Sequence, residues 1–335
     1  MKNRNAIPDL LKGIAVLCMI QVHVLEVFAI PTFTETAIGK ALLFLGGPWV
    51  APVFGAVFGY YIAASKKTTK ELWQRGGYLL LVGFGLNIAL NANLFYKIYI
   101  GSLQINPYPY LFGVDFLLFA GLALFPLTLL KNKQILGLLI ALVTASFLGT
   151  LLVTYTTTDT IANYILAFLY GTARWSYFPL LPWICYPLMG MLYRNLQVKK
   201  GWKLLQHSKT QHLILVLGSV FLFFTLDYAI EIASHLQNYY HHGISFVIWT
   251  GFFLMFLTST AYQVELKLSG NRVVKYLKWL GGNVTVIYIV QWILIGNIGT
   301  EIFQTVESPL LLIYSYISVL AGSSCIVLVW KKIAA

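Results

Sequence analysis

The sequence predicts an all-α, polytopic integral membrane protein: one domain over residues 1–335, a bundle of about ten transmembrane helices with both termini cytoplasmic. Composition is the first reason. Apolar residues make up 59% of the chain and charged residues only 10%, against about 45–50% and about 25% in soluble globular chains. These values exclude an ordinary soluble domain, a disordered chain and a disulfide-stapled module.

Apolar runs of membrane-spanning length are the second reason. A helix needs about 20 residues to cross a hydrocarbon layer about 30 Å thick. We predict ten such helices, each on one apolar run, at about residues 7–30, 41–64, 76–96, 110–130, 134–154, 177–194, 211–230, 243–261, 280–299 and 309–330. A further apolar segment, 161–172, has two interpretations. It is a re-entrant or interfacial helix, or an eleventh span that would reverse the topology after it.

The distribution of charge supports ten spans. With a cytoplasmic N-terminus, 19 of the 23 Lys and Arg residues fall in inner segments, as the positive-inside rule requires. The net charge of +12 is spread between apolar runs, so it does not indicate a nucleic-acid partner. The three cysteines predict neither a disulfide framework nor a metal site.

Ionisable residues are concentrated in the first run, where they are costly and indicate function. Asp9 and Lys12 are three residues apart, as are His23 and Glu26, so each pair can interact on one helix face. Lys12 and His23 share a face about 16 Å apart along the axis. We expect Glu26 to orient His23 and raise its basicity, which suits a general base. Alternatively, Lys12 snorkels to the headgroups and His23 faces the outer interface.

Other polar residues in the apolar runs have two interpretations each. Asp115 is either a polar partner inside the bundle or part of a structural ion pair. Arg174 and Trp183 flank a proline-interrupted stretch that either lines a substrate site or forms an interfacial aromatic belt. Asn283 and Gln291 either hold helices together or contact a substrate.

Four stretches in order resemble the transmembrane acyltransferase superfamily, which includes the heparan-α-glucosaminide N-acetyltransferase-like proteins and the related acyltransferase-3 family. They are the D-x-x-K-G opening followed by a histidine, the GVD run, the FPLLPW run and the late GGNVT…Y…QW span. In this chain they occupy 9–23, 112–121, 178–190 and 280–292. Lys12 stands where acyltransferase-3 members usually have Arg, and Gln291 stands where many members have His.

The resemblance implies an acetyl-CoA-dependent O- or N-acetyltransferase. Cytoplasmic acyl-CoA, with acetyl-CoA expected, would donate to a hydroxyl or amine of an extracytoplasmic saccharide or glycolipid. His23 would act as general base or transient acyl carrier, with Asn283, Gln291 or Trp183 donating to the oxyanion. The inner-loop cations would bind CoA phosphates; otherwise they are topology signals or contacts to membrane lipids. These cations are Arg194, Lys199, Lys200, Arg272 and Lys275.

The same resemblance implies a bacterial plasma membrane. The spacing of the cysteines and histidines predicts no metal site, and a homodimer stays open. A rival function uses the same intramembrane residues. In that hypothesis the protein is a proton-coupled transporter of a small polar solute, with a relay through Asp9, Lys12, His23, Glu26 and Asp115. Inverted repeats with paired broken helices would favour it, and the sequence shows none.

Overall fold

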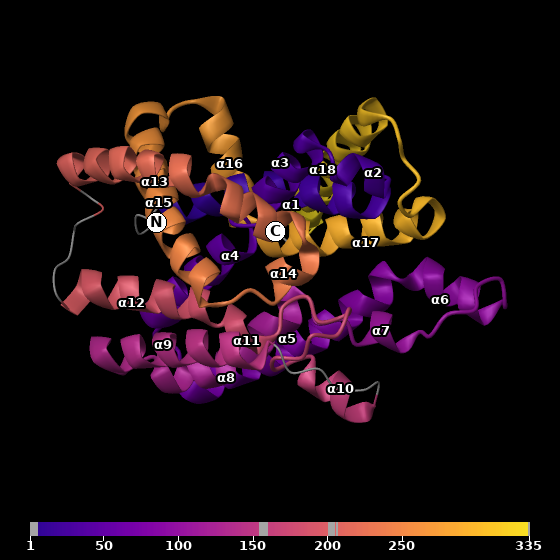
Figure 1. Cartoon of the computed structure of the whole chain (residues 1–335), viewed down its shortest axis with the longest axis horizontal. Coiled ribbons are helices and arrows are strands. Elements are labelled where there is room, and N and C mark those ends of the chain that lie inside the picture. Colours follow the sequence, from indigo (N-terminus) through magenta and orange to yellow (C-terminus); the bar gives the residue numbers. More distant parts are fainter. Residues whose placement is uncertain (1–5, 154–159, 200–204, 206, 334–335) are drawn as a thin grey trace.

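The computed structural model describes residues 6–153, 160–199, 205 and 207–333, and over these residues the regular structure is helical (Figure 1). The helices are α1 (Ala6–Phe28), α2 (Pro31–Thr34), α3 (Ala37–Gly46), α4 (Ala51–Ala64), α5 (Thr69–Leu90), α6 (Ala92–Tyr99), α7 (Tyr108–Leu111), α8 (Phe116–Leu130), α9 (Ile135–Leu152), α10 (Ile161–Leu166), α11 (Leu180–Trp183), α12 (Cys185–Lys199), α13 (Ser208–Ser234), α14 (Leu236–Tyr240), α15 (Ile244–Leu268), α16 (Arg272–Gly282), α17 (Val284–Ile302) and α18 (Pro309–Ile333).

Long apolar helices confirm a polytopic helical membrane protein. Seven helices in the described residues are long and apolar enough to cross a membrane, with α3 and α4 taken together, and the bent pair α5–α6 makes an eighth. The other two predicted runs hold the 15-residue helices α8 and α12. The full count of ten and the cytoplasmic termini stay predictions. Helix α10 has six residues, about 9 Å of rise, so it cannot be an eleventh span.

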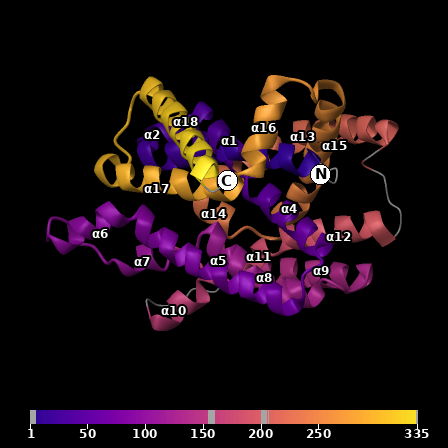
Figure 2. The ribbon, with the colours of Figure 1, turned by 180° about the vertical axis from the view of Figure 1, so that it is seen from behind.

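Helix α1 lies at the centre of the bundle. It contacts α3, α4, α15, α16, α17 and α18, and Figure 2 shows α16, α17 and α18 around it. Leu10, Ala15, Val16 and Ile20 are completely buried. A Cβ at Gly13 would collide with the backbone of α16, so glycine permits this close approach. The polar residues of α1 are therefore enclosed by other helices.

A second layer contains α5, α8, α9 and α12 in the lower part of Figure 1, and α4 lies between this layer and α1. Helix α4 packs closely on α12, where a Cβ at Gly59 or Gly190 would meet backbone atoms of the facing helix. Helices α6, α7 and α10 lie at the end of this layer that is opposite the C-terminus of α12, on the right of Figure 1. The charge pattern predicts that they lie on the outer side of the membrane.

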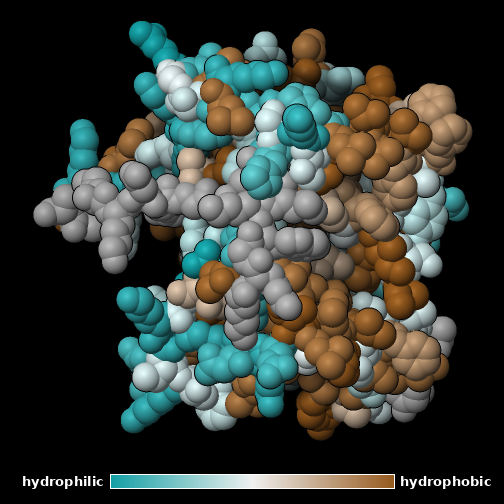
Figure 3. All heavy atoms as spheres, turned by 90° about the vertical axis from the view of Figure 1, so that its left-hand side faces the viewer, coloured by the Kyte–Doolittle hydropathy of each residue, from teal (hydrophilic) through white to brown (hydrophobic). Residues whose placement is uncertain are grey.

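The surface of the molecule is amphipathic. Figure 3 shows the end formed by α12 and α13, with hydrophilic residues gathered over one part and hydrophobic residues over the rest. On α13, Phe223 and Phe224 are 81% and 77% exposed. A soluble protein avoids exposed apolar patches of this kind, whereas a membrane covers them with hydrocarbon.

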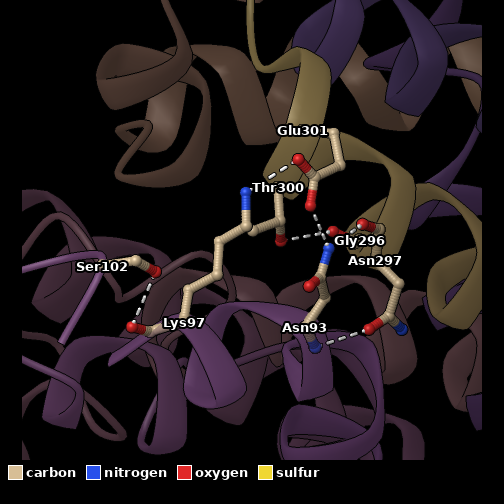
Figure 4. A network of polar contacts seen from close by, with 7 residues as sticks. All are labelled: Asn93, Lys97, Ser102, Gly296, Asn297, Thr300 and Glu301. Atoms are coloured by element: carbon tan, nitrogen blue, oxygen red, sulfur yellow. Dashed lines mark hydrogen bonds and ion pairs between the residues drawn. The ribbon is translucent and has the colours of Figure 1, made fainter. Parts of the chain in front are cut away.

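A polar network ties the C-terminal end of α17 to α6 (Figure 4). Asn297 accepts from the backbone N–H of Asn93 at 2.8 Å and donates to the Ala89 carbonyl at 2.8 Å. These contacts satisfy backbone groups at the break between α5 and α6, where the axes bend by 58°. Lys97 and Glu301 add an exposed ion pair at 2.7 Å.

We expect Asn297→Ala to destabilise the protein by about 1–3 kcal/mol, because it leaves half-buried backbone groups at this break unpaired. Lys97→Ala removes only a surface ion pair and should cost less than about 1 kcal/mol. Thermal unfolding of both variants in the same detergent measures the difference. A larger loss in Lys97→Ala than in Asn297→Ala would contradict this assignment of the network.

Candidate active site

His23 is held by α17 through one hydrogen bond. Its Nδ1 lies 3.0 Å from Oε1 of Gln291, which is completely buried. The Gln291 Nε2–H donates to the Tyr288 carbonyl at 3.3 Å, and this fixes which end of the amide faces the imidazole. An amide oxygen only accepts, so Nδ1 carries the proton and Nε2 keeps its lone pair. The half-buried imidazole is thereby set as a base through Nε2.

Trp292 fixes the plane of the same imidazole. The two ring centroids are 4.0 Å apart at 29°, a stacked arrangement. The Trp292 Nε1–H is buried near the Tyr288 side chain and makes no hydrogen bond of regular geometry within the described residues. Consecutive residues of α17 therefore set both the tautomer and the orientation of His23, and they place the buried Trp292 N–H beside it.

Glu26 does not orient His23, which corrects the sequence-based expectation. The imidazole bonds Gln291 instead, and the Glu26 carboxylate lies toward α14. Burial first, and then the charge of Glu26, hold the pKa of Tyr239 well above its usual value. Burial and then the charge of Glu26 are also the two largest causes that raise the pKa of Tyr240. Glu26 thus faces a tyrosine cluster on the segment between α13 and α15, one turn beyond His23.

Asp9 and Lys12 form the predicted pair near the start of α1. The Lys12 Nζ lies 3.0 Å from the Asp9 carboxylate, and both side chains are largely buried. The ammonium also lies 5.9 Å from the centre of the Tyr61 ring, within the range of a cation–π contact. Lys12 is therefore held inside the bundle by α1 and α4.

Asp115 caps a helix and accepts from α17. It is the N-cap of α8, where Oδ1 accepts from the Leu118 N–H at 2.9 Å. Its Oδ2 accepts from the Tyr288 hydroxyl at 3.4 Å. This geometry supports the polar-partner interpretation over the ion pair. Tyr288 lies one turn before Gln291, so Asp115 and His23 belong to one polar cluster.

A cavity of about 620 Å³ leads to this cluster. Lys12 and Arg75 supply its cationic groups, and Tyr61 lies beside them. Phe116 and Tyr288, the neighbours of Asp115, form another part of its wall. The volume lies within the roughly 300–1,000 Å³ usual for ligand sites. The cavity therefore joins two cationic side chains to the residues next to the His23 base.

Of the three residues predicted as oxyanion donors, Trp183 has used its only side-chain N–H, whereas Asn283 and Gln291 each have one of their two amide N–H groups engaged. The Trp183 Nε1–H donates to the Tyr240 carbonyl at 2.8 Å, and Trp183 is completely buried. Asn283, at the break between α16 and α17, donates to the Trp279 carbonyl at 2.6 Å. One N–H of the Gln291 amide donates to the Tyr288 carbonyl. Trp183 thus holds the backbone near the site and is excluded as an oxyanion donor, while the buried Trp292 Nε1–H lies on the ring that stacks on His23.

The remaining predicted cations are not gathered at the cluster. Arg174 is exposed between α10 and α11, and Arg272 and Lys275 are exposed on α16. Arg194 donates to the Tyr60 hydroxyl at 3.3 Å and lies over that ring. Lys199 ends α12, and Lys200 lies outside the described residues.

Sequence reasoning missed three residues of the site. Tyr288 and Trp292 lie inside the quoted late motif, so a signal for them existed. Arg75 is one of the 19 inner cations, and its position in the sequence indicates topology only.

In the described part of the chain, no group of three or more His, Cys, Asp or Glu is placed to hold a metal ion. His242 uses both ring nitrogens, on the Tyr239 carbonyl and the Tyr186 hydroxyl.

The helices and the polar cluster around His23 define a polytopic membrane protein with a polar site inside its helical bundle. A family model described as "Acyltransferase domain" matches residues 5–328, nearly the whole chain. The chain belongs to the acyltransferase-3 family. Comparison with curated proteins and with solved structures found no match.

Proposed function

We propose that the protein transfers an acyl group, with acetyl expected, from cytoplasmic acyl-CoA to a hydroxyl or amine of an extracytoplasmic saccharide or glycolipid. Family membership supports membrane acyl transfer in general. One observation supports the specific reaction. The cavity that holds Lys12 and Arg75 ends at Tyr288, one turn from the Gln291 that orients His23. A cationic entrance and the residues that position His23 are thus neighbours in the bundle.

The donor would enter this cavity from the inner side. Lys12 and Arg75 would contact its phosphates, since charge-assisted hydrogen bonds to phosphate are the strong ones. Arg272 and Lys275, exposed on the inner side, would meet phosphates further out. Arg194 is not part of this proposed donor site, because its guanidinium lies against Tyr60, which lines a different cavity. The thioester would then lie toward Tyr288 and Trp292.

The chemistry follows from the tautomer of His23. Its Nε2 takes the proton of the acceptor as the acceptor oxygen or nitrogen attacks the thioester carbonyl carbon. The carbonyl oxygen becomes an oxyanion, to which the Trp292 Nε1–H donates. Collapse breaks the carbon–sulfur bond, and the proton on His23 passes to the CoA sulfur. An acyl-histidine intermediate remains the alternative route.

The acceptor would approach from the outer side, where Glu26 meets the tyrosines of α14. Aromatic rings and a carboxylate suit a saccharide, which presents apolar ring faces and several hydroxyl or amine donors. The proposal includes three further points. The protein lies in the plasma membrane, it is related to the heparan-type proteins, and it acylates either an oxygen or a nitrogen atom. Two observations disfavour the transporter hypothesis: Asp9 and Lys12 form an ion pair with each other, and Asp115 caps a helix.

The direct test measures CoA release from acetyl-CoA by purified protein, with glucosamine and simple glycosides as acceptors. The proposal predicts acceptor-dependent release and an acetylated saccharide by mass spectrometry. If the protein binds acetyl-CoA but acetylates no saccharide, the acceptor class is wrong. If it binds no acyl-CoA, the reaction itself is wrong.

Arg75→Gln should weaken acetyl-CoA binding about tenfold or more, because it removes a charge-assisted contact to phosphate inside the cavity. Lys70→Gln is the matched control, since Lys70 is exposed on the same helix and lies outside the cavity wall. Calorimetry on both variants measures the change. Equal affinities in the two variants would remove Arg75 from the donor site.

A further inference from the structure

A second cavity, of about 400 Å³, takes no part in the proposed reaction. It lies between α1, α4, α12 and α15, and we call it the α12–α15 groove. Apolar side chains supply most of its wall. Along α15 it runs from Ile248 to Tyr262, about 21 Å of helix. That exceeds half of a hydrocarbon layer about 30 Å thick, so the groove has the length and polarity that suit an extended hydrocarbon chain.

The groove opens sideways. Ile248, Phe252 and Met255 of α15 line it and are 53%, 56% and 39% exposed. Because α15 is long and apolar enough to span the membrane, this rim faces hydrocarbon rather than water. A lipid chain can enter from the bilayer without passing through water, whereas a polar ligand cannot reach the groove by that path.

A cationic group lies at the inner end of the groove. The Arg194 guanidinium is half-buried, donates to the Tyr60 hydroxyl at 3.3 Å and lies 5.4 Å from the centre of that ring, and Tyr60 lines the groove. Within the described residues, no carboxylate lies at ion-pair distance from Arg194. A guanidinium has five N–H donors. Most of the Arg194 donors therefore remain for an anion.

A neighbouring hydroxyl makes the same end of the groove polar. Tyr193 lines the groove beside Tyr60, with the two ring centroids 6.2 Å apart. The side chains of Tyr262 and Gln197 lie within hydrogen-bonding reach of its buried hydroxyl. The wall near Arg194 therefore carries polar groups, whereas the rest of the groove is mostly apolar.

We propose that the α12–α15 groove binds an anionic glycerophospholipid of the cytoplasmic leaflet. One acyl chain lies in the groove and the phosphate accepts from Arg194, with the Tyr193 hydroxyl beside it. Arginine suits this role because its planar fork matches phosphate oxygens. The site is separate from the donor cavity, although Val57 of α4 lines both. The proposal does not depend on the acyl-transfer reaction.

Native mass spectrometry of the full chain tests the charged end. The protein is released from detergent after equilibration with equal amounts of phosphatidylglycerol and phosphatidylcholine. Wild type should retain phosphatidylglycerol preferentially, and Arg194→Gln should lose about tenfold or more of that retention. Lys267→Gln, exposed on the same side near the end of α15, should retain it as wild type does. Equal retention by the two variants would overturn the proposal.

Photocrosslinking tests the apolar part. Phosphatidylglycerol with a diazirine on its acyl chain is placed in nanodiscs with the protein, and adducts are mapped by peptide. They should concentrate on α12 and α15, and Gly251→Phe, which fills the groove against Met189, should remove them. Adducts spread evenly over lipid-facing helices would overturn the proposal. So would displacement of the lipid by free coenzyme A, because Arg194 would then belong to the donor site. If Gly251→Phe fails to fold, the Arg194→Gln comparison still decides.

Discussion

His23→Ala should lower acyl transfer by about 10²–10⁴-fold, the range for loss of a general base, while the protein still folds and inserts. The structural reason is specific. Gln291 holds the proton on Nδ1, so Nε2 is the basic atom available to an acceptor. The variant removes that atom and leaves α1 helical, because alanine is the best helix former. Turnover is measured as CoA release with the best acceptor from the glycoside panel.

His235→Ala is the matched control for this change. His235 is exposed in the segment between α13 and α14, and its Nδ1 lies 2.8 Å from the Glu231 carbonyl. It lies outside the polar cluster, so its loss should leave turnover unchanged. Near-normal turnover in His23→Ala, with unfolding midpoints that match wild type, would remove His23 from the mechanism.

Trp292→Phe should lower kcat by about 10²–10³-fold, the effect of losing one oxyanion donor. Phenylalanine keeps an aromatic ring stacked on His23 and removes only the buried Nε1–H. The KM for the acyl donor should change little, because the interaction forms only as the oxyanion develops. Steady-state kinetics with varied acetyl-CoA separates the two parameters.

The control for this change is Trp249→Phe. Trp249 is buried on α15 and donates to the Thr225 hydroxyl at 2.9 Å. Its loss should lower stability by about 1 kcal/mol without changing kcat. A raised KM with normal kcat in Trp292→Phe would show instead that Trp292 binds the donor equally in the ground and transition states.

The helices could be predicted from the sequence because hydrocarbon imposes a length and an apolar composition on each of them. Their breaks were harder to predict. The run 41–64 is interrupted near Gly47, and 76–96 bends at Asn91, where contacts from α17 compensate the lost helical hydrogen bonds. Hydropathy does not detect such breaks, because the residues around them remain apolar.

The candidate site was predictable only in part. Asp9 and Lys12 interact because residues three apart on one helix must be neighbours. The same rule suggested Glu26 as the partner of His23, but the imidazole turns to Gln291, 268 residues away. Which side chains of different helices meet depends on packing that spacing within one run does not contain. Arg75 and Arg194 illustrate a second limit, since a cation in an inner segment has the same appearance whether it fixes topology or binds an anion.

Binding of acetyl-CoA to the purified full-length protein, measured by calorimetry, tests the central claim most directly. The proposed donor cavity predicts a micromolar-range affinity, weakened about tenfold or more by Arg75→Gln and unchanged by His23→Ala, which acts on the chemical step. Absence of binding by acetyl-CoA and by longer acyl-CoAs to well-folded protein would contradict the assignment of the Lys12–Arg75 cavity. Flux measurements for the transporter hypothesis would then follow.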